Sequence, residues 1–370
     1  MNRRSVVTQW IMTSVAACLA LYFASEFLVP ITIALLGYLT LRNLVVRMCK
    51  LGVPRTLSAM LTMIILVAIG GTAIVLLYSP AQQWLTTAPA TVGRVQEKIR
   101  QIRQPLETID KATEELNSDA SEDAELEVQV DQPQLISSDV VLTRTGNMLL
   151  LIAVIAVTTF FLLATGDEIL NRGLRILPTD EDRDKAIELA SNIHDAVGSY
   201  LMHITVINIG LGIVVSVAMW LLGMPTPVLW GAIATLFNFV PYVGPLAASG
   251  VVFIAAVGEF DSFTYAAGVA VVFWLITAVE GQFVTPSVLG KNLELGPVVV
   301  LISVAFWGFM WGIPGVFIAV PLVIAMRLVF DCFETTKPVA TLLGSSECEP
   351  PDCDQQLEDH EELAEMASAD

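Results

Sequence analysis

Long apolar runs follow one another along almost the whole chain. A helix needs about 20 apolar residues to cross the hydrocarbon core of a bilayer, and most of the runs reach or approach that length. They cover residues 6–25, 27–41, 56–79, 147–165, 200–222, 228–257, 263–285 and 297–330. The pattern predicts an all-α polytopic membrane protein with about eight hydrophobic segments, and the sixth and eighth are longer than one span requires.

The composition supports this class, because 55% of the 370 residues are hydrophobic and only 15% are charged. A water-soluble globular domain carries more charge than this. The formal net charge of −18 lies mostly in two polar blocks, residues 107–131 and 347–370. Since little basic surface remains outside short loops, the chain lacks the electrostatic footprint of a nucleic-acid-binding protein, and we exclude that partner.

Basic residues in short loops set the expected orientation, because such loops stay on the cytoplasmic side of a membrane. Two arginines precede the first run, and the loop before the third run is basic. These residues are Arg3, Arg4, Arg42, Arg47, Lys50 and Arg55. We therefore expect both termini to lie in the cytoplasm.

The polar stretches divide the chain into parts. Residues 80–146 form an extracytoplasmic insert, which we expect to be small and helical. Residues 167–199 contain Thr179 followed by acids, a pattern typical of a helix start, and predict a cytoplasmic helix along the membrane surface that leads into the fifth span. The acidic tail 341–370 is predicted to be disordered. The remaining parts are the first three spans in 1–79, the fourth span in 147–166 and a transport core in 200–340.

Apolar residues recur every three or four positions within the insert, from Val92 to Leu116, which predicts a helix with one apolar seam that Pro105 should kink. Two interpretations of the seam remain open. It packs on the chain itself, against the spans or a short alternating strand at 125–130, or it contacts another subunit. The second interpretation makes a homo-oligomer a possible assembly.

Two of the long runs contain helix breakers near their middle. Pro241 and Pro245 interrupt the sixth run, and the glycines and proline of 308–315 interrupt the eighth. A break at membrane depth leaves backbone groups unpaired, so it must face protein or a water-filled cavity. Two late, broken segments are typical of the binding region of a transporter. Kinked spans that merely pack tightly are the alternative, and the sequence does not separate kinked spans from re-entrant hairpins.

Enzymatic and metal-binding motifs are missing from the sequence. It contains no H-E-x-x-H pair, no G-x-S-x-G elbow and no phosphate-binding loop. Cys348, Cys353 and His360 in the tail match no standard metal-ligand spacing. We predict a protein that is not an enzyme and uses no cofactor and no metal, so any transport runs on an ion gradient or on the gradient of the solute itself.

The stretch from Tyr200 to Phe330 resembles the carboxyl-terminal half of the autoinducer-2 exporter (AI-2E) family of bacterial permease-like transporters. Three motifs carry the resemblance. They are Pro-Tyr-x-Gly-Pro at 241–245, Glu-Gly with Thr-Pro and Gly-Lys within 280–291, and Gly-x-x-Gly with Ala-x-Pro within 312–321. The resemblance implies a transporter of the bacterial inner (plasma) membrane. It would either export a small polar solute such as autoinducer-2 or exchange a monovalent cation for protons.

The breaks and the motifs together give a candidate pathway for substrate or ion. Glu280 is the candidate coupling carboxylate, because ionisable residues at membrane depth are costly and tend to face a pathway. The alternative for Glu280 is an interfacial anchor whose side chain reaches the membrane surface. The full set is Asn238, Pro241, Tyr242, Gly244, Pro245, Glu280, Gly281, Pro286, Gly312, Gly315 and Pro321.

The chain departs from the family pattern at the start of the fifth span. Met202, His203 and Ile204 stand where the family often has Arg-Gly-Gln, so inherited substrate specificity does not follow from the resemblance. The predicted function is a secondary transporter in contact with the lipid bilayer, with a small solute or a monovalent cation and protons as its ligands. The alternatives are a non-transporting oligomeric scaffold or adaptor and a passive channel.

Overall fold

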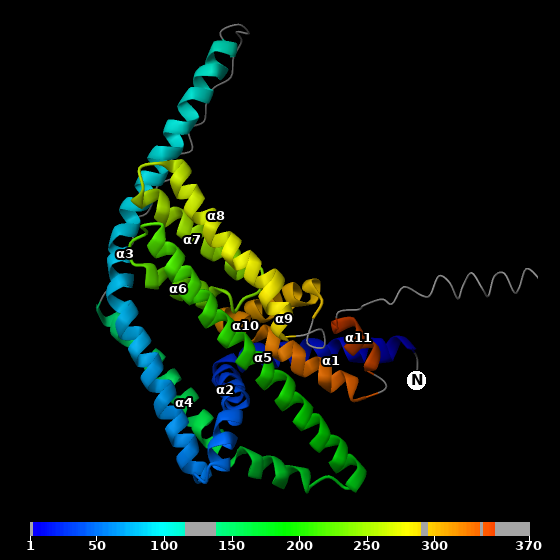
Figure 1. The fold of residues 1–370 in the computed structure, drawn as a ribbon. Helices are drawn as coiled ribbons and strands as arrows, with labels where there is room; N and C mark the ends of the chain where they lie inside the picture. The colour runs from blue at the N-terminus through cyan, green and yellow to red at the C-terminus, as the bar shows by residue number, and fades with distance from the viewer. Residues whose placement is uncertain (1–2, 115–137, 290–294, 334–335, 345–370) are drawn as a thin grey trace, which may run out of the picture.

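The computed structural model describes residues 3–114, 138–289, 295–333 and 336–344, and within these ranges the chain is helical, with one isolated β-bridge between Leu295 and Gly344 (Figure 1). This confirms the predicted all-α class. The elements are α1 (Arg3–Phe23), α2 (Ser25–Lys50), α3 (Arg55–Glu114), α4 (Ser138–Leu174), α5 (Asp180–Leu221), α6 (Pro227–Phe237), α7 (Val243–Glu259), α8 (Phe263–Val279), the π-helix η1 (Glu280–Val284), α9 (Thr285–Leu289), α10 (Pro297–Asp331) and α11 (Lys337–Leu343).

Six of the described helical stretches are long and apolar enough to cross a membrane, and α6 and α7 are shorter apolar helices. Large apolar side chains remain exposed on the spans. On α3, for example, Ile64, Val67, Ile69 and Val75 are all more than half exposed. Such a surface requires an apolar solvent, so these helices contact the lipid bilayer.

The polar insert begins as a direct continuation of the third span. A single helix, α3, runs for 60 residues from Arg55 to Glu114, which corresponds to about 90 Å at 1.5 Å per residue. Its last part projects beyond α7 and α8 (Figure 1). The side chains of the apolar seam and the strand predicted at 125–130 lie outside the described residues, as does the acidic tail beyond Gly344.

The start of the fifth span also differs from the expectation. The sequence predicts a separate helix along the membrane surface, whereas the structure contains one continuous helix, α5, of 42 residues. Thr179 caps it as predicted, because its hydroxyl accepts a hydrogen bond from the backbone N–H of Asp182 at 3.1 Å. No proline follows until Pro225, so the surface segment and the span form one continuous helix.

The sixth apolar run folds back on itself as the hairpin α6–α7. Its reversal lies at residues 238–242, and a Cβ atom placed on Gly244 would meet the carbonyl oxygen of Phe237 at 1.7 Å. Residues seven apart in a straight helix are about 10 Å apart along the axis. The sixth segment is therefore a re-entrant hairpin, and the choice that the sequence left open is decided here in favour of the hairpin.

The eighth run reverses in the same way inside α10. Gly312 has a positive φ of 65° with ψ −147°, a conformation that glycine adopts readily. Beyond it, a Cβ atom on Gly315 would meet the carbonyl oxygen of Trp307 at 1.9 Å. The two halves, residues 297–311 and 313–331, therefore lie against each other. Phe239 at the first reversal and Phe317 near the second are in ring contact, with centroids 6.4 Å apart.

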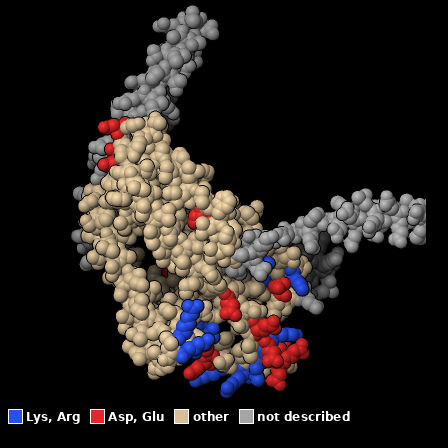
Figure 2. All heavy atoms as spheres, viewed as in Figure 1, with Lys and Arg blue, Asp and Glu red and all other residues tan. Residues whose placement is uncertain are grey.

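Charged residues gather at one end of the molecule, where the α2–α3 and α4–α5 turns lie (Figure 2). Asp167, near the end of α4, joins three helices there. It pairs with Arg42 of α2 at 3.0 Å and with Arg55 of α3 at 2.8 Å. Tyr38 donates a further hydrogen bond to it at 2.6 Å. The three charged side chains are only 23–32% exposed, so this cluster fixes the packing of α2, α3 and α4.

The close approach in the hairpins predicts that Gly244→Ala and Gly315→Ala destabilise the protein. Each added methyl group would overlap a backbone carbonyl that cannot rotate away, and overpacking of this kind costs about 1–3 kcal/mol or more. Gly250→Ala on the same helix α7 is the matched control, since its Cβ would meet nothing within 4 Å. Thermal unfolding of the detergent-purified variants measures this. Equal melting temperatures for Gly244→Ala and Gly250→Ala would contradict the hairpin geometry.

The ion-pair cluster predicts that Asp167→Asn lowers the free energy of unfolding by about 1–3 kcal/mol, a cost between those of surface and buried pairs. The loss leaves two half-buried guanidinium groups without their carboxylate. Glu168→Gln is the neighbouring control. It breaks a pair with Arg172 whose side chains are 67% and 78% exposed, and we expect a cost below about 1 kcal/mol. Asp167→Asn should lower the melting temperature clearly more than Glu168→Gln does. Equal decreases in the two variants would show that the Asp167 cluster does not stabilise the packing of α2, α3 and α4.

Candidate functional site

A cavity of about 670 Å³ lies where the first hairpin meets α8 and its continuation. Four parts of the chain build it: the middle of α5, the reversal of α6–α7, the stretch from α8 through η1 to α9, and the base of the α10 hairpin. Its lining comprises Tyr200, Ile204, Asn238, Pro241, Tyr242, Pro245, Leu246, Trp274, Thr277, Ala278, Glu280, Gly281, Gln282, Thr285, Pro286, Leu289, Leu295, Pro297, Val300 and Val320.

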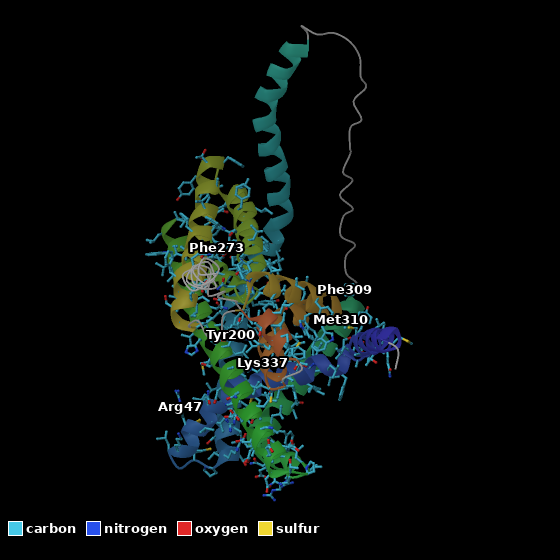
Figure 3. All side chains as sticks on the ribbon, turned by 90° about the vertical axis from the view of Figure 1, so that its right-hand side faces the viewer. Arg47, Tyr200, Phe273, Phe309, Met310 and Lys337 are labelled. Carbon is cyan, nitrogen blue, oxygen red and sulfur yellow. The ribbon has the colours of Figure 1, made fainter. Side chains whose placement is uncertain are left out.

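Tyr200 of α5 lines this cavity. In Figure 3 it lies in the middle of the molecule, between Phe273 of α8 and the charged end that contains Arg47. Val300 and Val320 line the same cavity although they are separated by Gly312, because the two halves of α10 run back along each other. The hairpin reversals therefore bring distant parts of the sequence to one place near the middle of the molecule.

Glu280 is a buried carboxylate in the wall of this cavity, with 6% of the residue exposed. Its Oε2 atom accepts a hydrogen bond from Asn238 Nδ2 at 2.9 Å, and its Oε1 atom accepts a short one from the Thr285 hydroxyl. Among the ion pairs between described residues none involves Glu280. The carboxylate is thus held by neutral donors in the wall of the cavity.

The backbone at Glu280 is unusual as well. Glu280 ends α8 and begins η1, a five-residue π-helix whose wider turn continues directly into α9. The hydroxyl of Thr285, the first residue of α9, donates a hydrogen bond to the carboxylate of Glu280, five positions earlier. Short π-helical turns within α-helices occur frequently at functional sites, and here the turn holds the carboxylate and its hydroxyl donor together.

Polar contacts continue from Glu280 into the protein. Asn238 also donates from Nδ2 to Asn208 Oδ1 at 2.8 Å, and Thr235 Oγ1 donates to the backbone oxygen of Asn208 at 3.0 Å. Asn208 is completely buried on α5. The chain of hydrogen bonds joins α5, the reversal of the first hairpin and η1, which are separated by 30 and 42 residues in sequence.

Tyr242 sits at the tip of the first hairpin in a strained backbone conformation. Its φ of 63° and ψ of −54° go with a hydrogen bond from the Val243 N–H to the Pro241 carbonyl at 2.7 Å. This is a γ-turn with positive φ, a rare and strained form. Strain of this kind persists where the surrounding structure fixes it, and it concentrates at ligand-binding sites. The Tyr242 side chain is 53% exposed and lines the cavity.

The structure brings together most of the residues that the sequence singles out. Asn238, Pro241, Tyr242, Pro245, Glu280, Gly281 and Pro286 line the cavity. Gly244 does not, because its place is the close contact with Phe237 inside the hairpin. Ile204, one of the three residues that depart from the family pattern, does line it.

The second break contributes less to the cavity than the sequence predicts. Gly312, Gly315 and Pro321 are not among the described lining residues. The tip of α10 instead packs towards α1, where Trp311 Nε1 donates to the carbonyl oxygen of Leu21 at 3.1 Å. Phe309 and Met310 lie on this part of α10, close to α1 (Figure 3). The base of the hairpin faces the cavity, because Pro297, Val300 and Val320 are among its lining residues.

Sequence reasoning did not include Asn208, Thr285 or Trp274 in the site. Thr285 belongs to the Thr-Pro motif. Asn208, like Asn238, stands out in the sequence as a polar residue within an apolar span, but the predicted pathway did not include it. Trp274 gives no such signal, since aromatic residues are common in membrane helices. Its position in the lining depends on the packing of α8.

Comparison with known proteins agrees with this architecture. The family model described as AI-2E family transporter matches residues 11–334. The AI-2 transport protein TqsA of Escherichia coli K12 is 26% identical over 93% of this chain and 96% of its own length. The putative transport protein YueF of Bacillus subtilis is 26% identical over 83% of this chain and 84% of its own length. The predictions of a membrane transporter and of no enzyme are confirmed, and the chain belongs to the AI-2E family of transporters.

Proposed function

We propose that this protein is a secondary transporter of the bacterial inner membrane, that its solute binds in the cavity beside Glu280, and that Glu280 is the coupling carboxylate. The observation that carries the proposal is the buried carboxylate, held by neutral donors, in a cavity that a helix reversal creates. A charge at membrane depth is costly and is retained where it serves a pathway. The lack of a basic partner among the described residues leaves a proton or a cation as the natural counter-charge.

The size of the cavity favours a small organic solute over a bare cation. A volume of about 670 Å³ falls within the range of pockets that hold small molecules, about 300–1,000 Å³. Its wall mixes apolar and aromatic surface with a few polar groups, as such pockets do. The name of the relative TqsA makes autoinducer-2 the first solute to test.

Cation/proton exchange is the second candidate function. It is favoured by the pairing of the Glu280 carboxylate with the Thr285 hydroxyl, since hydroxyl and carboxylate oxygens suit a hard cation. In this form Glu280 would hold a proton and a cation in turn. A vesicle experiment separates the two functions, because one responds to an added cation and the other to an added solute.

The expected orientation follows from the charge distribution. The end that carries Arg42, Arg47, Lys50 and Arg55 would face the cytoplasm by the positive-inside rule, together with both termini. The projecting part of α3 lies at the opposite end (Figures 1 and 2) and would then extend from the outer face. In this orientation the direction of flux that we propose is export.

Glu280→Gln should abolish coupled transport while the folded protein stays in the membrane. Glutamine keeps an oxygen that accepts the hydrogen bond from Asn238, but it can neither take up nor release a proton. The measurement is the fluorescence of a pH-sensitive dye in everted membrane vesicles on addition of sodium, lithium, potassium or autoinducer-2. We expect the response of the unmodified protein to fall to the level of vesicles without it.

Glu259→Gln, at the exposed end of α7, is the matched control and should transport normally. Full activity of Glu280→Gln would remove Glu280 from the mechanism. A flux that ignores the proton gradient in the unmodified protein would indicate a passive channel in place of a coupled transporter.

A further inference from the structure

Asn208 ties the Glu280 carboxylate into a chain of two side-chain amides. The Asn238 nitrogen lies 2.9 Å from Glu280 Oε2 and 2.8 Å from Asn208 Oδ1. An amide nitrogen carries two hydrogens, and in this arrangement both of those on Asn238 are donated. Asn208 is completely buried, and its own Nδ2 finds no acceptor among the described residues. The pattern fits an ionised Glu280, which only accepts hydrogen bonds.

The same heavy-atom positions support a second pattern. The oxygen and nitrogen of an amide exchange places when the group makes a half-turn about its last side-chain bond. If Glu280 takes up a proton on Oε2, that atom becomes a donor, and a half-turn of Asn238 presents Oδ1 to it. A half-turn of Asn208 then lets its nitrogen donate to the same Oδ1. Both contacts remain hydrogen bonds, with donor and acceptor reversed and no movement of the backbone.

We propose that Asn238 and Asn208 form an amide relay that carries the protonation state of Glu280 into the contact between α5 and α6. This inference rests on the proposed coupling role of Glu280. The proton enters from the cavity onto Oε2 and leaves by the same route, and no other covalent bond changes. At the far end of the relay, the buried end of Asn208 presents an N–H while Glu280 is a carboxylate and a C=O while Glu280 is protonated.

The contact between α5 and α6 beside Asn208 is closely packed, so a change in the hydrogen bonding of Asn208 would affect how the two helices pack. Beside Asn208, α5 and α6 approach so closely that a Cβ atom on Gly212 would meet the carbonyl oxygen of Gly231 at 2.8 Å. Thr235 of α6 bonds the backbone oxygen of Asn208. α6 is the first arm of the hairpin whose tip holds Asn238 and Tyr242. A relay that ends at this contact links the protonation of Glu280 to α6, the helix that leads to Asn238 and Tyr242 in the cavity wall.

Few other titratable groups face Glu280. In the described lining of the cavity these are Tyr200 from α5 and Tyr242 from the hairpin tip, and α8, η1, α9 and α10 contribute none besides Glu280. His203 on α5 is exposed and bonds the backbone oxygen of Ser199 at 2.7 Å. Two neutral groups contact Glu280 directly, the Thr285 hydroxyl and the Asn238 amide. Of these, the Asn238 amide is the one that also contacts Asn208.

Infrared difference spectroscopy of the purified full-length protein, between acidic and alkaline buffer, tests the relay without relying on transport. Isotope-labelled asparagine marks the side-chain amide bands without any mutation. We expect a carboxyl band that is absent in Glu280→Gln, together with shifts of labelled amide bands that are also absent in Glu280→Gln. Loss of part of these amide shifts in Asn208→Leu would assign that part to Asn208.

A titrating Glu280 without amide shifts would overturn the relay and leave the proposed function standing. A Glu280 that shows no carboxyl band at any pH would also overturn the relay, and the vesicle assay would then decide the coupling role separately. As a second readout, Asn208→Leu should move the midpoint of the pH profile of transport by about one pH unit. Thr235→Val, which removes the bond to the Asn208 backbone but not the amide contact, should leave that midpoint in place.

Discussion

The pairing of backbone groups inside the membrane is the constraint on which the structure depends. Lipid offers no hydrogen-bond partner, so a chain that leaves the helical conformation at membrane depth must place the freed groups against protein or in a hydrated cavity. This protein does so at residues 238–242 and at Gly312. Both interruptions become full reversals, because glycines behind them allow one arm to pack directly on the backbone of the other. The first reversal places Asn238 and Tyr242 in the cavity wall, and the second packs against α1, where Trp311 bonds Leu21.

Two carboxyl groups, the partly buried Asp167 and the buried Glu280, lie in different settings. Asp167 lies between Arg42 and Arg55 and fastens three helices at the charged end. Glu280 lies in an apolar region and meets an amide and a hydroxyl, both neutral. The first arrangement satisfies its charge permanently. The second has no cationic partner among the described residues, and the proposed coupling role of Glu280 depends on this setting.

The sequence was sufficient for the features that depend on local pattern. Run length predicted the spans, the two proline and glycine clusters predicted the breaks, and Thr179 marked a helix start. It did not show that α3 continues into the insert as far as Glu114 or that α5 is one helix, because polar residues within a helix do not by themselves end it. Hairpin or kink stayed open, since proline blocks a hydrogen bond without fixing the direction of the chain beyond it. The close packing of Gly244 on Phe237 fixes that direction, and it is a tertiary contact.

The candidate site was predictable only in part for the same reason. Asn238 and Glu280 stand out as polar residues in apolar runs, and the structure joins them by a direct hydrogen bond. Asn208 gives the same signal, but its place in the site depends on the packing of α5 against the first hairpin. The tip of α10 carries an equally clear break and yet packs towards α1. A break predicts that backbone groups need partners, and only the fold decides whether those partners are a ligand or another helix.

Thiol labelling inside the cavity tests most directly whether the solute binds there. Ala278 lines the cavity beside Glu280, so Ala278→Cys would be placed in a chain whose five natural cysteines are replaced by serine. A membrane-impermeant maleimide would then be applied with and without the solute or cation that drives the vesicle response. The account predicts that labelling is slowed by that ligand and that the protection is lost in Glu280→Gln. A labelling rate that the transported ligand does not change would contradict binding in this cavity.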